Sequence, residues 1–107
     1  MTGGGRRRPL ERIGDLIPDA ARRLGLDDEL RLARAMSTWA AIVEERVPPA
    51  AGAARLIRLD GFTLVVETDH PIVAQEIRLR APELLAAFAA APGGYPAREV
   101  RTTVRHA

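Results

Sequence analysis

The chain has 107 residues, of which 47% are hydrophobic and 28% charged, with no cysteine and a formal net charge of +2. This length favours one domain, and the composition is typical of a folded domain and not of a disordered chain. Without cysteine there is no disulfide framework and no thiolate zinc site, which fits a cytoplasmic protein. No apolar run approaches the roughly 20 residues of a membrane helix, and no secretory signal is recognisable, so we expect no membrane partner.

Positive charge is concentrated at the two ends of the chain. Residues 1–8 carry a charge of +3 and residues 98–107 a charge of +2, whereas residues 9–97 carry −3. Because residues 1–8 contain three successive glycines and no apolar anchor, we predict a flexible basic arm before a single domain of residues 9–107. If the protein binds a polyanion, the two ends are the first candidates for the contact.

Two helices are predicted before the first strand. Residues 9–24 place apolar side chains at three- and four-residue steps, which indicates a helix. We expect a break near Pro18, because proline in a helix interior costs about 3 kcal/mol, and a C-cap at Gly25. A second helix is predicted from Asp27 to the Pro48-Pro49 pair, with Trp39 as a core anchor.

A β-hairpin is predicted over residues 55–67. The Asp60-Gly61 pair favours a two-residue type I′ loop, which places Leu59 opposite Phe62. Because side chains alternate along a strand, one face is then apolar and expected to be buried, namely Ile57, Leu59, Phe62, Leu64 and Val66. The other face consists of Leu56, Arg58, Thr63, Val65 and Glu67.

The last third of the chain predicts helix and then strand. A helix begins at Pro71, capped by Asp69 or His70, and Pro82 either kinks it or lies in the first turn of another helix. Residues 98–104 alternate as a third strand. The expected fold is a two-layer α+β domain in the order ααββαβ, with a small mixed three-stranded sheet packed on helices.

No catalytic or cofactor motif is recognisable. His70 and His106 lie far apart in the sequence, and Ser37, the only serine, has no nucleophile-elbow context. There is no GxGxxG and no GxxxxGK[ST] motif for a nucleotide. We therefore expect no catalytic residue, no metal, no cofactor and no small-molecule substrate, and the chain is predicted not to be an enzyme.

Four segments form a recognisable combination when they are read in order. They are PLERIGDLIPDAARRLGL, LRLARAMSTWAAIVEERV, LDGFTLVVETD and AQEIRLRAPELL. In this order and spacing the sequence resembles the DciA family of bacterial replicative-helicase loaders over about residues 9–104. Trp39 matches the family's helix-two Trp, and Gln75 and Glu76 lie in a step that matches its A-Q-E-L motif. Glu44 departs from the Gly that is usual there, and Val73 from a frequent second Trp.

The resemblance implies a fold similar to a KH domain, and two partners: the replicative helicase and single- or double-stranded DNA. Since the sequence lacks the GxxG loop of a true KH site, DNA contact is expected to depend on arginines. The candidates are first Arg6, Arg7, Arg8, Arg98, Arg101 and Arg105, and second Arg55, Arg58, Arg78 and Arg80. Two alternatives stay open: a ribosome-associated, KH-like RNA-binding module, and a purely protein-binding adaptor.

Overall fold

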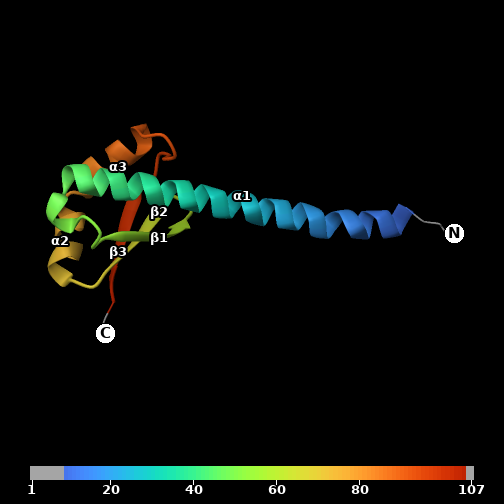
Figure 1. The fold of residues 1–107 in the computed structure, drawn as a ribbon, viewed down its shortest axis with the longest axis horizontal. Helices are drawn as coiled ribbons and strands as arrows, with labels where there is room; N and C mark the ends of the chain where they lie inside the picture. Colours follow the sequence, from blue (N-terminus) through green and yellow to red (C-terminus); the bar gives the residue numbers. More distant parts are fainter. Residues whose placement is uncertain (1–8, 106–107) are drawn as a thin grey trace. The chain divides into compact units, whose positions relative to one another are not determined.

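The computed structural model describes residues 9–105 (Figure 1). The chain forms two compact units, Met1–Leu30 and Arg31–Ala107. The described part of the first unit is helical. The helices and strands are α1 (Pro9–Arg46), a 3₁₀ turn η1 (Pro48–Ala50), β1 (Arg55–Asp60), β2 (Thr63–Thr68), α2 (Pro71–Leu79), α3 (Ala81–Ala90) and β3 (Glu99–Val104).

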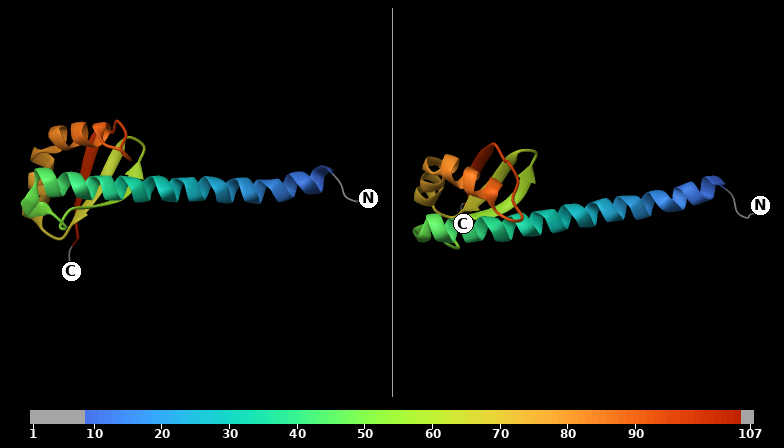
Figure 2. Two further views of the ribbon diagram at one scale, coloured as in Figure 1. Left: turned by 45° about the horizontal axis from the view of Figure 1, so that its top comes forward. Right: turned by 90° about the horizontal axis from the view of Figure 1, so that it is seen from above.

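The three strands form one mixed sheet in the order β1-β2-β3. β1 and β2 pair antiparallel as a hairpin, and β2 pairs with β3 in parallel. A parallel pair needs a long crossover connection, and here α2 and α3 supply it (Figure 2). The predicted α+β fold class with a small mixed three-stranded sheet is therefore confirmed.

The core of the second unit lies between the helices and one face of this sheet. Trp39 is fully buried there, as predicted, and its indole Nε1 donates a hydrogen bond of 3.1 Å to the Ala54 carbonyl oxygen. Helices and strands contribute to a single apolar cluster that includes Val43, Leu56, Leu64, Val66, Ile77, Leu84 and Phe88. One contiguous core is what a two-layer domain of this size requires.

The hairpin register differs from the predicted one. Asp60 pairs with Thr63, so the two loop residues are Gly61 and Phe62, and Gly61 takes the positive φ of 62°. The pairing also shifts between Leu56 and Arg58, where Ile57 is the extra residue of a β-bulge.

The bulge and the shifted loop change which side chains are buried. Leu56 lies opposite Val66 on the core face, although it was predicted on the other face. Ile57 is 37% exposed and Phe62 54% exposed, so their predicted burial is wrong. The prediction assumed strict alternation, which one extra residue in a strand reverses.

The first helix differs from the prediction, and the structure decides between the two alternatives at Pro82. α1 is continuous through Pro18 and Gly25, where a break and a C-cap were predicted. A proline removes one backbone hydrogen bond and a glycine costs about 1 kcal/mol, so neither forbids helical turns on both sides. At Pro82 the second of the two alternatives is correct, because α3 begins at Ala81 with Glu83 in its first turn.

Candidate nucleic-acid and partner-binding surfaces

The candidate arginines do not gather at one site. Arg6, Arg7 and Arg8 lie outside the described residues. The other seven are exposed and come from separate places in the fold. Arg55 and Arg58 lie in β1, Arg78 in α2, Arg80 just after α2, Arg98 just before β3, Arg101 in β3 and Arg105 just after β3.

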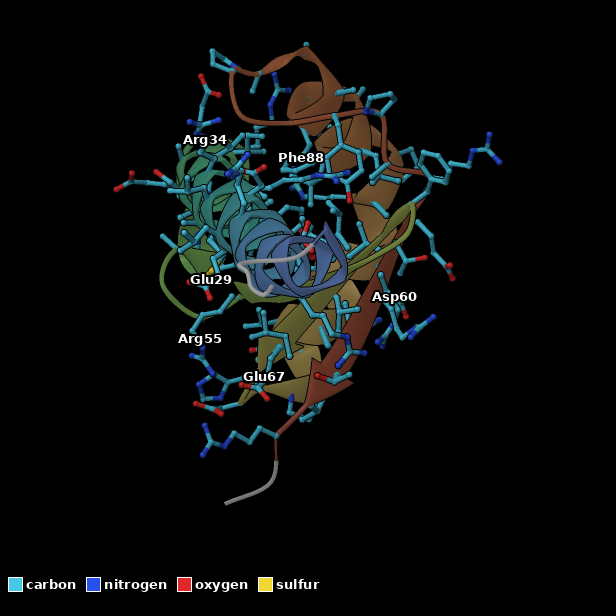
Figure 3. All side chains as sticks on the ribbon, turned by 90° about the vertical axis from the view of Figure 1, so that its right-hand side faces the viewer. Glu29, Arg34, Arg55, Asp60, Glu67 and Phe88 are labelled. Carbon is cyan, nitrogen blue, oxygen red and sulfur yellow. The ribbon has the colours of Figure 1, made fainter. Side chains whose placement is uncertain are left out.

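The sheet face opposite the core carries arginines together with acids. Arg58 and Arg101 lie on either side of Val65, which is the register partner of both. Arg101 lies 3.7 Å from an Asp60 carboxylate oxygen. Arg55 lies 3.2 Å from Glu67, at a different part of the sheet from Asp60 (Figure 3). Exposed pairs of this kind are weak, so these arginines can exchange partners, but the face has no large excess of positive charge.

Two further candidates have partners within the fold. The Arg78 Nη1 donates a hydrogen bond of 2.6 Å to Thr102 Oγ1, which links α2 to β3. The Arg80 Nε donates to Glu76 Oε2 at 2.7 Å, and this bond is the main cause of the raised pKa of Arg80. Glu76, which lies next to Gln75 in the step that matches the family's A-Q-E-L motif, therefore has a local structural role.

A compact group at the end of the hairpin consists of Gly61, Phe62, Tyr95 and Arg98, and we call it the hairpin-tip cluster. The Arg98 guanidinium carbon lies over the Phe62 ring, 4.9 Å from its centroid. The backbone N–H of Arg98 donates to the Phe62 carbonyl oxygen at 2.7 Å. The Tyr95 hydroxyl donates to the Gly61 carbonyl oxygen at 3.1 Å. The loop before β3 thus holds the turn between β1 and β2 in place.

Tyr95 connects this cluster to the core. Its ring meets Phe88 edge to face with centroids 5.5 Å apart, and the Arg31 guanidinium lies 5.2 Å from its centroid. Partial burial raises the pKa of Tyr95, while the charge of Arg31 acts in the opposite direction. The hydroxyl is therefore protonated at neutral pH and available as the donor to Gly61.

A second surface lies on α2 and consists of Ile72, Gln75 and Leu79, which we call the α2 face. These residues are three, four and seven positions apart, so they lie on one side of the helix. Ile72 is 77% and Leu79 70% exposed, although they are large apolar residues. Ile72 also lines a cleft of about 450 Å³ whose other walls include Val47, Pro48 and Pro49.

The predicted motif residues divide between these roles. In the A-Q-E-I step, Ala74 and Ile77 are fully buried and Glu76 holds Arg80. Gln75 is exposed on the α2 face, and no hydrogen bond of its side chain occurs among the described residues. Gln75 is thus the motif residue that the described fold does not explain.

Sequence reasoning missed the aromatic part of the hairpin tip. Phe62 was predicted on the buried face of the hairpin, and no binding role was predicted for Tyr95 or Ile72. One feature of the sequence is compatible with the observed loop. Gly61 can take a positive φ as the first loop residue, which allows a Gly61-Phe62 loop one residue later than the predicted Asp60-Gly61 loop.

Neither a metal-binding group nor a membrane-spanning helix is found among the described residues. No group of three or more His, Asp or Glu side chains there is arranged to hold a metal ion. In residues 9–105 no helix is long and apolar enough to cross a membrane.

Comparison with known proteins assigns the chain to a family. No curated protein matches the chain. The family described as "Dna[CI] antecedent, DciA" matches residues 12–102, which is most of the sequence. The chain therefore belongs to the DciA family, the helicase loaders of bacterial DNA replication, which associate with the replicative helicase.

Proposed function

We propose that this protein assists the loading of the replicative helicase by binding both the helicase and DNA, in the cytoplasm and without catalysis of its own. The observation that carries the proposal is the family match over residues 12–102. The structure supports it with two separate exposed surfaces, the α2 face and the hairpin-tip cluster, which suit two different partners.

The α2 face is our candidate for contact with the helicase. Protein interfaces have apolar centres surrounded by polar groups. Ile72 and Leu79 supply exposed apolar area, and Gln75 lies between them with an amide that can donate and accept. Beside this face Arg80 and Glu83, 3.9 Å apart, supply charged groups of both signs. An exposed apolar face with a mixed charged border fits a protein better than it fits a polyanion.

DNA contact is assigned to the arginines at the two ends of the chain. The strongest candidates remain Arg6–Arg8, Arg98, Arg101 and Arg105. Arg78 and Arg80 rank lower, because their guanidinium groups already donate to Thr102 and Glu76. Arg55 and Arg58 lie in β1, away from either end of the chain, and stay in the second rank.

The mechanism requires only linked binding. A protein that contacts both helicase and DNA stabilises the state in which the two are engaged, because the second contact becomes intramolecular. Such coupling is reciprocal: DNA should raise the affinity for the helicase by the same factor by which the helicase raises the affinity for DNA. No nucleotide hydrolysis by this chain is involved.

The test is co-purification with the host's replicative helicase, with and without forked DNA. We expect the helicase to be retained, and to be retained more strongly when the fork is present. Competition with RNA of the same sequence separates the alternative RNA-binding reading, since an RNA reader senses the 2′-hydroxyl. Loss of all helicase retention under both conditions would contradict the proposal, and retention without any response to DNA would leave a protein-binding adaptor.

A further inference from the structure

We propose that Phe62 and Arg98 form a stacking platform for one unpaired base of single-stranded DNA. This inference rests on the DNA binding proposed above, and it specifies the form of the ligand and the residues that select it. Four points lead to it: the exposure of Phe62, the contacts that fix its turn, the charges around it, and the accessibility of base faces in single-stranded and duplex DNA.

The exposure of Phe62 has no explanation in the fold. Phe62 is 54% exposed and does not belong to the core cluster or to the partly buried residues packed against that cluster. The backbone of Phe62 serves the turn, since its carbonyl oxygen accepts from the N–H groups of Arg98 and Glu99. A polar residue would provide the same carbonyl, so the turn does not require the aromatic ring, whose contact partner is the Arg98 guanidinium.

Neighbouring residues fix the position of the Phe62 ring. Arg98 lies over the ring. The turn that carries Phe62 is fixed by a hydrogen bond from the Tyr95 hydroxyl to the Gly61 carbonyl oxygen. Tyr95 is in turn packed on the core residue Phe88. An aromatic on such a braced turn loses little conformational freedom on binding, which is the condition for an effective stacking contact.

The charges at the tip favour stacking over simple phosphate attraction. Arg98 and Arg101 are accompanied there by Asp60, 3.7 Å from Arg101, and by Glu99, which accepts from Thr63 Oγ1 at 3.2 Å. With Arg58, which like Arg101 is a register partner of Val65, three positive groups lie near two negative ones, so the net charge is only +1. A contact at this place therefore releases few counterions, and its affinity must come from the ring and the guanidinium plane, on which any base can stack.

Access then selects single strands over duplex. Bases in a duplex are stacked on one another, and their faces are closed to a side chain unless they are flipped out. An unpaired base presents a free π-face, and an aromatic ring flanked by Arg is the usual protein counterpart. Protein partners are less favoured at the tip, because one ring with charges of both signs around it offers little apolar area.

The test uses two substitutions at one position. Phe62→Leu keeps an apolar side chain but removes the π-face, whereas Phe62→Trp keeps and enlarges it. Because Phe62 lies outside the core, both variants should unfold at the wild-type temperature. Affinity for an oligothymidylate and for a duplex of the same length is measured across salt concentrations by fluorescence anisotropy.

We expect Phe62→Leu to bind the oligothymidylate roughly 5- to 150-fold more weakly, the range for loss of one stacked base. Its salt dependence and its duplex affinity should match the wild type. The Phe62→Trp protein should retain the affinity, and its added indole should be quenched by the oligonucleotide, while the buried Trp39 gives a constant background.

Two results overturn the inference in different ways. If the wild type binds the oligothymidylate and Phe62→Leu binds it equally well, the platform is wrong and the proposed DNA binding stands. If the wild type binds neither oligonucleotide at low salt, the proposed DNA binding fails and the platform fails with it. Loss of helicase retention by Phe62→Leu with unchanged DNA binding would reassign the tip to a protein partner and also overturn the inference.

Discussion

Two isoleucines on the same helix separate a binding role from a folding role. Ile72 is 77% exposed, and Ile77, five residues further along α2, is fully buried. Complete burial of an isoleucine side chain is worth about 1.5–3 kcal/mol. If the helicase covers most of Ile72, then Ile72→Ser should weaken helicase binding by about 1–2 kcal/mol, which is roughly a 5- to 30-fold loss of affinity.

The same substitution should leave the fold intact. An exposed position changes the free energy of unfolding by about 0.5 kcal/mol or less. By contrast, Ile77→Ser leaves a cavity in the core and buries a hydroxyl, which should cost about 3–5 kcal/mol of the 5–15 kcal/mol typical of a domain.

The assay is a titration of the labelled protein with the host's replicative helicase, together with chemical denaturation of each variant. We expect Ile72→Ser to be as stable as the wild type and to bind the helicase more weakly. If Ile72→Ser binds the helicase as tightly as the wild type does, the α2 face is not the docking surface. If it unfolds early, the side chain has a structural role that its exposure does not indicate.

Three further predictions follow from the charges, the glycines and the single tyrosine. Replacing Arg6–Arg8 with alanine should lower DNA affinity and reduce the slope of log affinity against log salt by up to about three units, and an unchanged slope would exclude the arm. Gly94→Ala should lower the free energy of unfolding by about 2–3 kcal/mol, because the added Cβ would collide with the Phe88 carbonyl oxygen. Gly61→Ala meets open space and should cost only about 1 kcal/mol, for its positive φ. Equal costs for the two variants in chemical denaturation would contradict this account. Tyr95 is the only tyrosine, so tyrosinate absorbance reports it alone, and the titration should lie above the usual pKa near 10. Since the raised pKa of Tyr95 belongs to the folded state, the contribution of Tyr95 to stability is fully present below the unfolded pKa near 10 and is lost as the pH rises through the folded pKa. Tyr95→Phe should remove that loss.

Much of the fold was readable because it depends on local patterns. The apolar spacing around Trp39, the proline at the start of α2 and the alternation in β3 each predict an element from its own residues. The hairpin was less readable at residue level. Whether Asp60-Gly61 or Gly61-Phe62 forms the loop depends on which register packs better on the helices, and that is a property of the whole core.

The candidate surfaces were only partly predictable for a related reason. Arg98 and Arg101 were identified from charge alone, and the structure adds that acids accompany them. Phe62 and Ile72 could not be recognised as exposed, because a sequence pattern gives the apolar residues of an element without saying which ones the core has room for. The partners of Arg78 and Arg80 also depend on tertiary placement.

The bulge at Ile57 has a consequence for how this protein associates. β1 and β3 are the two outer strands of the sheet, and an outer strand with unpaired backbone groups invites a further strand from another molecule. On β1 the kink at the bulge and the charges of Arg55, Arg58 and Asp60 oppose this, and on β3 Glu99 and Arg101 do the same. Copies of the chain are thereby discouraged from joining edge to edge into aggregates, and binding is left to side-chain surfaces. Contacts of that kind can be released again, as a loader requires once its helicase is in place.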